Sequence, residues 1–587
     1  MEEKLVYEHT FPLRHHWWID SGIIGLYNIA GQLKDSNSQY HSIHYSVNMQ
    51  ELIFQAPSQQ TLKDFLDSCY EELANRYWNV STRKQREANE LVIYDKNTNQ
   101  FGLIPRRSPT PIPGLFTKGS SYRAENEEYA KLSMKMQERV DTFLLENQKT
   151  LWGAKKRLLY DSPVCHPIIQ LFPNKGTRTT CCICGQENIC SEVSQPSFLL
   201  FASPTATLSF NSEGKKPDKI CWECQFLSKF AVEAAYYKQR IKDRKPENLF
   251  ILQMTTSHAE KLINSHMFLN AQANVRQFDE ENHLSNIGTT KSDNRLLYYA
   301  KLPYEFLWAF FHDSYESLRI EAEEHAQSAE ELTMLCIKPV IETPLQIYLL
   351  VIGYKGQTFM IKEIIAYSET AYAFRLLHSF HEEFAQDHKF LFKVFRDLYL
   401  PNEGKAFDIS NNLWRNRILQ RVLQKKDILQ QMESFAFRKS LKDDFPFLGN
   451  LLNFTQSYQL KIKEGIGMTQ DQVDVAVNLG RQIVLSARDI AKDISGSNFD
   501  RVKGDLFTLR KTRTVTDFLE QLNRIQFRYN IVVSNQILGG ILEKVTFDDF
   551  KSYCLLGALN TYNNFKRSKG KKDDEETRDE NQEDKGE

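Results

Sequence analysis

Two pairs of cysteines in the middle of the chain have the spacing of metal ligands. Cys181 and Cys184 form one C-x-x-C pair, and Cys221 and Cys224 form a second pair after a gap of 36 residues. Two such knuckles supply the four thiolates of a tetrahedral Zn²⁺ site, and four protein ligands leave no open position for catalysis. The spacing therefore predicts one structural Zn²⁺ ion, held by a small zinc-ribbon-like module inserted at residues 175–228.

Other cysteines near these pairs are weaker ligand candidates. Cys182 and Cys190 could replace Cys181 in the metal shell. Cys165 and His166 are a further pair, but we expect them to be partly buried before Pro167. The four-cysteine set therefore remains the predicted site.

The sequence contains no catalytic constellation that predicts an enzyme. Gly214-Lys215-Lys216 lacks the upstream glycine and the Ser/Thr of a phosphate-binding loop. His312-Asp313 is the dipeptide used by HD-type metal-dependent nucleases and phosphohydrolases, and His378, His381, Asp387 and His388 could add ligands. That alternative stays open, but the prediction is a chain without an active site.

Composition places the chain among multidomain globular proteins. It has 587 residues, 41% hydrophobic and 25% charged, and the formal net charge is −1. Residues 573–587 carry nine acids and two bases, so residues 1–572 have 72 bases against 66 acids, a net charge of +6. With no apolar run long enough to cross a bilayer and no signal peptide, we expect a cytoplasmic protein with no membrane partner.

The pattern of elements predicts an α+β fold that ends in a C-terminal four-helix bundle. Residues 346–354 are expected to form a buried strand, and residues 230–242 have helical spacing. Thr469 and Gln472 form a capping box before an amphipathic helix that reaches residue 494. Further helices are expected at residues 500–509, 516–529 and 546–565. The predicted domains are 1–174 and 229–455 (an N-terminal α+β domain around the zinc module), 456–566 (the bundle) and 567–587 (a disordered acidic tail).

Basic residues on predicted loops and helix faces could contact nucleic acid. Arg106, Arg107 and Lys118 lie in the proline-rich loop at residues 105–121, while Asn174 and Lys175 lie on the loop that enters the zinc module. Such side chains neutralise phosphates and can reach base edges in a groove. The bundle adds a basic strip that could follow a single strand, formed by Arg481, Arg488, Lys492, Arg510, Lys511 and Arg513.

Three features together resemble a known family. They are Asp20-Ser21-Gly22-Ile23 after the aromatic start His15-His16-Trp17-Trp18, the paired C-x-x-C module, and the C-terminal helical bundle. This layout resembles the large subunit of type I CRISPR Cascade complexes, in the C-x-x-C/C-x-x-C branch of the I-A and I-B systems. We interpret Asp20-Ser21-Gly22-Ile23 as a fold-forming turn, in which glycine permits a tight backbone.

The resemblance implies a non-catalytic subunit of an RNA-guided antiviral complex. Its partners would be guide RNA, target double-stranded DNA, the handle-binding, backbone and small subunits, and an effector helicase-nuclease or transposition protein. The family's N-terminal domain recognises the protospacer-adjacent motif, and its C-terminal bundle lies near the displaced strand. We assign motif recognition to Arg106, Arg107 and Lys118, with Asn174 and Lys175 as second choices. A zinc-ribbon nucleic-acid-binding scaffold outside CRISPR is a further alternative.

Met468 could be an internal start of translation. Codons for Lys463-Glu464-Gly465 can spell a bacterial ribosome-binding sequence, AAGGAGG, a few nucleotides before the Met468 codon. That codon stands where the predicted bundle begins, so we hypothesise that the bundle is also made alone, as a separate small subunit. The other interpretation is that Met468 is an ordinary linker residue.

Overall fold

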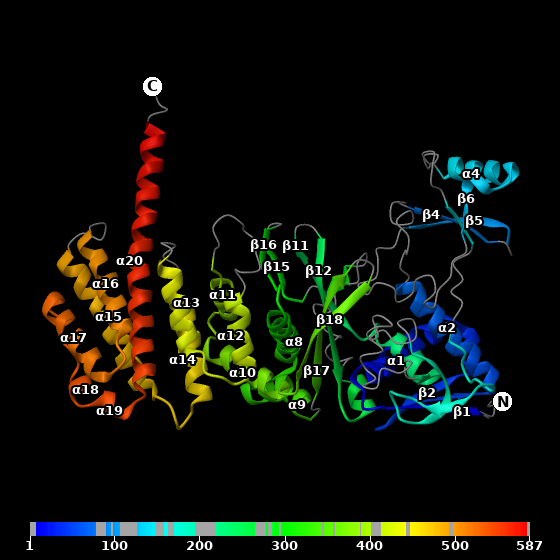
Figure 1. The fold of residues 1–587 in the computed structure, drawn as a ribbon, viewed down its shortest axis with the longest axis horizontal. Coiled ribbons are helices and arrows are strands. Elements are labelled where there is room, and N and C mark those ends of the chain that lie inside the picture. Colours follow the sequence, from blue (N-terminus) through cyan, green and yellow to red (C-terminus); the bar gives the residue numbers. More distant parts are fainter. Residues whose placement is uncertain are drawn as a thin grey trace. The chain divides into compact units, whose positions relative to one another are not determined.

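The computed structural model describes most of the chain as two compact units (Figure 1). Unit 1 comprises Met1–Gly288 and Ala309–Arg375, and unit 2 comprises Thr289–Trp308 and Leu376–Glu587. The described residues are 7–77, 90–95, 98–105, 126–147, 158–161, 169–193, 219–242, 245–264, 278–279, 284–285, 287–292, 295–342, 345–355, 358–387, 389–400, 413–441, 447–491 and 497–583. Among these, no helix is long and apolar enough to span a membrane.

Unit 1 begins with a three-stranded antiparallel sheet in the order β1-β3-β2. Its elements are β1 (Tyr7–Pro12), α1 (Trp17–Ser36), η1 (Ser38–Tyr40), β2 (His44–Val47), β3 (Glu51–Ala56) and α2 (Gln59–Tyr77). Alternate residues of β3, namely Leu52, Phe54 and Ala56, are buried because successive side chains of a strand face opposite sides. The predicted turn at residues 20–23 is wrong, since these residues lie inside α1.

A second sheet of unit 1 is antiparallel in the order β11-β12-β17-β18. It contains β11 (Tyr236–Lys242), β12 (Lys245–Thr255), β17 (Gln346–Lys355) and β18 (Thr358–Tyr367). The strand predicted at residues 346–354 is confirmed as β17, whose apolar side chains are buried. The helix predicted over residues 230–242 is wrong. Tyr236 and Tyr237 pair with Leu252 and Ile251 of β12, so long-range pairing overrides the local helical spacing.

Smaller elements complete unit 1. A sheet in the order β5-β4-β7-β6 contains one parallel pair, β4 with β7. These elements are β4 (Glu90–Asp95), β5 (Gln100–Pro105), β6 (Asn126–Glu128), η2 (Tyr129–Lys131), α4 (Met134–Glu146) and β7 (Leu158–Asp161), with β13 (Phe278–Asp279), β14 (Leu284–Ser285) and α9 (Ala329–Glu342) later in the chain. Two helices have residues in both units, α8 (Pro303–His325) and α10 (Thr370–Glu383).

Unit 2 is mainly helical. After β15 (Thr289–Ser292) and β16 (Arg295–Tyr299), its helices are α11 (Phe390–Asp397), α12 (Leu413–Leu423), α13 (Leu429–Leu441), α14 (Gly449–Ile462), α15 (Gln470–Ala491), α16 (Ser497–Lys511), α17 (Val515–Tyr529), α18 (Asn535–Leu538), α19 (Ile541–Lys544) and α20 (Phe547–Glu583). Helices therefore occupy all four positions predicted in the C-terminal region. Gln472 and Thr469 exchange the hydrogen bonds of the predicted capping box at the start of α15.

The C-terminal helices pack closely and also contact the helices before them. A Cβ atom on Gly480 of α15 would lie 1.9 Å from the carbonyl oxygen of Cys554 in α20, so these two backbones are in contact. Asn563 of α20 donates a 2.9 Å hydrogen bond to Ser440 of α13. The boundary predicted between residues 455 and 456 falls inside α14, and a separate four-helix bundle stays a prediction.

Helix α20 extends into the acidic segment, where the sequence predicts disorder from residue 567. It runs without interruption to Glu583 and is drawn in red in Figure 1. Each residue added to an existing helix forms one further hydrogen bond, whereas a new helix must first be nucleated at a cost. The buried part of α20, which includes Phe550 and Cys554, provides that nucleus.

Candidate metal centre and nucleic-acid interface

The four predicted ligands come from two knuckles at the ends of short strands. Strands β8 (Arg178–Thr180), β9 (Glu187–Glu192) and β10 (Lys219–Cys221) form a sheet, and α6 (Trp222–Phe230) follows directly. In the first knuckle, the Gly185 amide donates to the Cys181 carbonyl, and Gly185 adopts a φ of +71° that favours glycine. In the second knuckle, Cys221 ends β10 and Cys224 lies in the first turn of α6.

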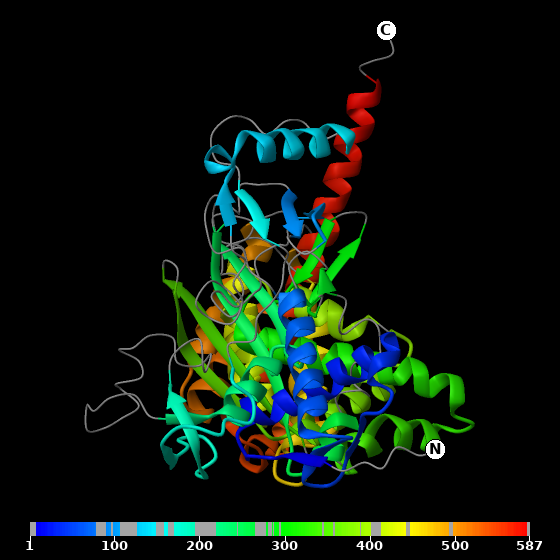
Figure 2. The ribbon, with the colours of Figure 1, turned by 90° about the vertical axis from the view of Figure 1, so that its right-hand side faces the viewer.

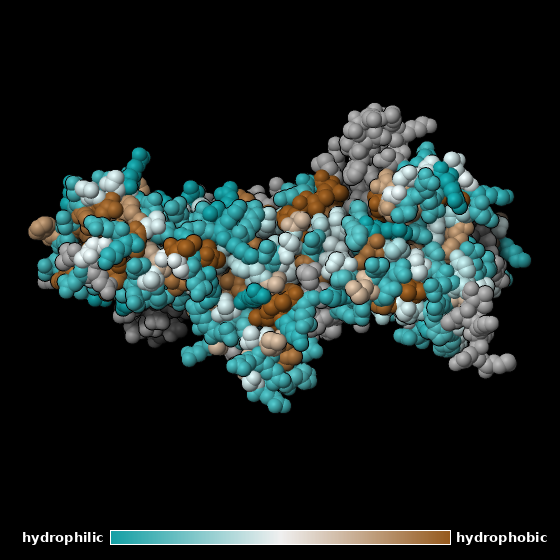
Figure 3. All heavy atoms as spheres, turned by 90° about the horizontal axis from the view of Figure 1, so that it is seen from below, coloured by the Kyte–Doolittle hydropathy of each residue, from teal (hydrophilic) through white to brown (hydrophobic). Residues whose placement is uncertain are grey.

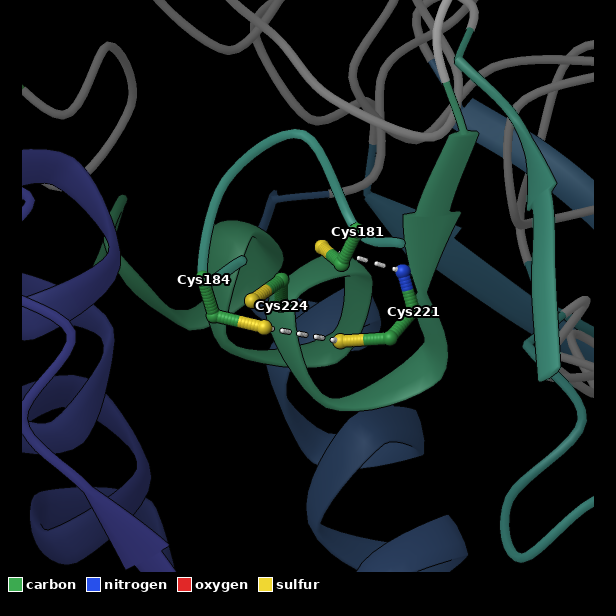
Figure 4. Close-up of side chains that lie close together, drawn as sticks. All are labelled: Cys181, Cys184, Cys221 and Cys224. Carbon is green, nitrogen blue, oxygen red and sulfur yellow. Dashed lines mark hydrogen bonds between the residues drawn. The ribbon is translucent and has the colours of Figure 1, made fainter. Parts of the chain in front are cut away.

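The sulfur atoms of Cys181, Cys184, Cys221 and Cys224 form one compact group (Figure 4). All lie within 4.8 Å of one another, and the Sγ atoms of Cys184 and Cys221 are 3.8 Å apart. A tetrahedron with Zn–S bonds of about 2.3 Å has sulfur–sulfur edges of about 3.8 Å. The geometry is therefore compatible with a four-cysteine zinc site, as the spacing predicts.

The electrostatics of the group also fit a bound cation. Hydrogen bonds with Cys184, Cys221 and Cys224 lower the pKa of Cys181, which favours a thiolate there. The contact with Cys181 is the largest of the causes that raise the pKa of Cys224. Four thiolates this close repel one another unless a divalent cation lies between them, and such a cation keeps coordinating thiols deprotonated. When bound, Zn²⁺ would cross-link the two knuckles.

The alternative ligands lie outside the group. Cys182 is exposed, and Cys190 donates from its Sγ to the carbonyl oxygen of Thr179 at 3.4 Å. The structure therefore brings Cys181, and neither of these two, into the metal shell. Cys165 and His166 lie outside the described residues.

A partly buried ion pair next to the cysteines was not predicted. The Arg14 guanidinium donates to the carboxylate of Glu223, which lies between two ligands in Cys221-Trp222-Glu223-Cys224. Burial alone would lower the pKa of Arg14, but the carboxylate of Glu223 and the neighbouring cysteines outweigh burial and raise it. A charged residue inside a C-x-x-C pair is the signal that could have predicted a cationic partner. This pair connects the residues before α1 to the second knuckle.

Asp20 completes this contact by accepting a 2.7 Å hydrogen bond from the Arg14 amide. Burial raises the pKa of Asp20 to about 6, so the folded protein binds the Asp20 proton more tightly than the unfolded chain does. Its contribution to the free energy of unfolding therefore falls as the pH rises from about 4 to about 6. Asparagine at this position keeps a side-chain oxygen that accepts the hydrogen bond, but it has no carboxyl group to titrate. We expect the stability of Asp20→Asn relative to the natural chain to rise by about 1 kcal/mol between pH 5 and pH 7.

Urea unfolding at both pH values, followed by tryptophan fluorescence, measures this difference. Groups that titrate in both proteins contribute equally to both free energies of unfolding, so their effect cancels in the difference. A relative stability that stays constant between pH 5 and pH 7 would show that Asp20 is not held in a desolvated site.

The residues predicted to recognise the motif are only partly described. Arg106, Arg107 and Lys118 lie outside the described residues. Asn174 and Lys175 are exposed on the loop before β8, where Gly176 has a φ of +146°. Both side chains are therefore accessible to a partner, and their role in DNA recognition stays a prediction.

The basic strip predicted in the C-terminal helices divides into two groups. Arg510 donates to the buried carboxylate of Glu433 at 2.6 Å, and the Arg488 guanidinium lies 4.7 Å from the ring centre of Phe565. Arg510 therefore has an internal structural role, and Arg488 is packed against α20. Arg481, Lys511 and Arg513 are exposed, whereas Lys492 lies outside the described residues.

Arg481 lies at the edge of a surface pocket of about 450 Å³. Polar side chains on the pocket wall are Asn478, Gln482, Ser534 and Asn535, and apolar ones are Val475, Leu479, Leu485 and Ile537. The Ser534 hydroxyl is buried and makes no hydrogen bond within the described part of the chain. The pocket thus combines an apolar floor with a cation and amide groups, which can bind phosphate and the edges of bases.

The arrangement around His312 and Asp313 does not form a metal site in the described structure. Asp313 accepts a 2.9 Å hydrogen bond from the Gly288 amide, and His312 Nδ1 is 3.4 Å from Asp313 Oδ1. In the described residues, only the four cysteines form a group of three or more metal-ligating side chains. The geometry therefore gives no support to an HD-type catalytic centre.

Comparison with known proteins adds no family assignment. No protein-family model matches the chain, and a search of curated proteins finds no match. The resemblance described above therefore rests on the motifs of the sequence.

Proposed function

We propose that this chain is the large subunit of a type I CRISPR surveillance complex and has no active site of its own. In this role it recognises the protospacer-adjacent motif in target DNA, stabilises the RNA–DNA hybrid with its displaced strand, and recruits a helicase-nuclease or transposition protein. Guide RNA pairing reads the target sequence, while protein side chains read the short motif and the backbone. The four cysteines hold a structural Zn²⁺.

The observation that carries the proposal is the contact between the two motifs on which the resemblance depends. Gly22 lies against the Leu227 carbonyl of α6, at a distance that excludes any side chain. Trp18 donates a 3.0 Å hydrogen bond from Nε1 to the Ser228 carbonyl, also in α6. The Asp20-Ser21-Gly22-Ile23 element in α1 therefore packs against α6, the helix that continues from the second knuckle, and this proximity supports treating them as parts of a single family signature.

The exposed cations of the C-terminal helices support a nucleic-acid partner on that side. We expect Arg481→Ala to weaken DNA binding by the assembled complex several-fold and to reduce the slope of log K against log salt concentration by about 1, the effect of one phosphate contact. Arg510→Ala is the matched control, because Arg510 forms an ion pair with Glu433. That variant should lose stability and keep the salt slope. Equal salt slopes for Arg481→Ala and the natural chain would show that Arg481 makes no contact with a DNA phosphate.

The motif-recognition part of the proposal is tested with short duplexes. The chain, assembled with its guide RNA and backbone subunits, is titrated with target DNA that carries or lacks a protospacer-adjacent motif. We expect Arg106→Ala/Arg107→Ala to lower the affinity for motif-bearing DNA at least about thirtyfold, since the two lost base contacts cost about 1–3 kcal/mol each. Unchanged discrimination between the two duplexes would assign motif recognition to other residues.

The internal start at Met468 remains part of the proposal. Lys463, which precedes it, donates a 2.8 Å hydrogen bond to Asp549 of α20 and also pairs with Asp427. A product that begins at Met468 would lack Lys463 and leave Asp549 without this ion pair. Synonymous recoding of Lys463-Glu464-Gly465, which leaves the protein unchanged, should abolish a small C-terminal product on expression if the start is used.

A further inference from the structure

An exposed apolar stripe runs along α9, next to the end of α8. Met334, Leu335 and Ile341 are 55%, 40% and 44% exposed, although α9 buries Cys336, Ile337 and Val340 on its other side. Met334 and Ile341 are seven residues apart and so lie on the same side of the helix, two turns from each other. Helix α9 therefore has one face packed in unit 1 and a second apolar face without a described partner.

Acidic residues surround this stripe. Residues 316–342, which form the end of α8, the connection and α9, contain seven glutamates against one arginine and one lysine, for a net charge of −5. Glu330 and Glu331 are exposed one turn before Met334 and Leu335, and Lys338 is paired with Glu342. Residues four apart are neighbours on a helix surface, so the apolar stripe has acidic side chains at its border.

The end of α8 has the same character. Ile320 is exposed there together with Glu321 and Glu324, while Leu318 and Ala322 are buried. Figure 2 draws α8 and α9 in green, and Figure 3 shows brown apolar groups among teal hydrophilic ones. We name residues 316–342 the acidic hairpin.

We infer that the acidic hairpin is a docking surface for a partner protein segment that is basic and has apolar side chains. Single exposed apolar residues are ordinary, but several on one helix face within an acidic border mark an interaction site. Nucleic acid and anionic lipid are both repelled by a net charge of −5, so charge complementarity selects a cationic partner. An amphipathic basic helix places its apolar side chains on the stripe and its Lys or Arg beside the glutamates.

This inference does not depend on the proposed function, and site-specific photo-cross-linking tests it. Benzophenone-phenylalanine replaces Met334 in the full-length chain, which is co-expressed with the proteins encoded by its neighbouring genes. We expect an adduct with a protein whose cross-linked segment has a net positive charge and apolar residues. The control position is Met134, which is also exposed but lies on α4; it should not give the same adduct.

Charge reversal distinguishes a specific interface from a chance contact. Glu321→Lys/Glu324→Lys/Glu330→Lys should reduce the Met334 adduct about tenfold, because it replaces attraction by repulsion. If this variant is unstable, the cross-linking at position 334 is repeated without the charge reversal in about 0.5 M salt. The salt screens the attraction between the glutamates and the partner, so it should reduce the adduct in the same way. The inference is overturned by an adduct with nucleic acid, with a second copy of this chain or with a segment that is not basic. An adduct insensitive to charge and salt, or no adduct, also overturns it.

Discussion

Replacing Cys184 by serine is expected to abolish stoichiometric zinc binding and to destabilise unit 1 strongly. Its Sγ atom is 3.8 Å from that of Cys221, and the four sulfurs lie within 4.8 Å of one another. Structural zinc sites contribute on the order of 10 kcal/mol to folding in small domains. Here the second knuckle continues into α6, whose residues Phe226, Leu227 and Phe230 are buried. Loss of the ion is therefore expected to disturb the packing of these residues in the core of unit 1.

Metal analysis and thermal unfolding together measure this effect. The natural chain should contain one zinc per molecule, and Cys184→Ser should contain almost none and unfold at a lower temperature. Cys190→Ser is the matched control, because Cys190 lies in the same sheet but donates to Thr179 instead of joining the group. That variant should keep one zinc. A natural chain purified without zinc, and equally stable with or without a chelator, would contradict the site.

Replacing Gly22 by alanine is expected to destabilise the protein although alanine favours helices. A Cβ atom at this position would lie 2.1 Å from the Leu227 carbonyl oxygen, and 2.7 Å from the carbonyl carbon. Backbone atoms cannot rotate away as a side chain can, so α1 and α6 must separate. Overpacking of a core typically costs about 1–3 kcal/mol of stability. We expect a loss near the upper end of this range, because the added Cβ would meet backbone atoms.

Gly504→Ala is the control for this prediction. Gly504 also lies inside a helix, α16, but no atom outside its own neighbourhood is within 4 Å of the added Cβ. There alanine should stabilise by up to about 1 kcal/mol through helix propensity alone. If α1 and α6 are in contact, chemical unfolding should show a lower free energy of unfolding for Gly22→Ala and a higher one for Gly504→Ala. A stabilised Gly22→Ala variant would contradict the packing of the two motifs.

The features that could be predicted from sequence depend on residues close together in the chain. Each cysteine pair is separated by two residues, so its chemistry is visible in the spacing, and pairing of the two knuckles follows from the coordination number of zinc. Helix α15 was predicted for a similar reason, because Thr469 and Gln472 fix its start and apolar residues recur with helical spacing.

The features that were missed depend on partners far away in sequence. Gly22 was assigned to a turn, but the close approach of α6, about 200 residues later, is what excludes a side chain there. The DNA role of Arg510 stays a prediction, but its ion pair with Glu433, which lies 77 residues earlier, is not indicated by any nearby residue. Arg14 and Glu223 were not singled out for the same reason. A local pattern can indicate that a partner is needed, as Glu223 does, but it does not identify the distant residue that supplies it.

Assembly with a guide RNA decides whether this chain is a subunit of a CRISPR surveillance complex. The full-length chain is co-expressed with a guide RNA and the backbone and handle-binding subunits of its own gene cluster, and the purified complex is weighed by native mass spectrometry. We expect a complex that contains guide RNA and one copy of this chain with its zinc. Failure of the chain to join any guide RNA complex, while the other subunits assemble without it, would show that the chain is not such a subunit.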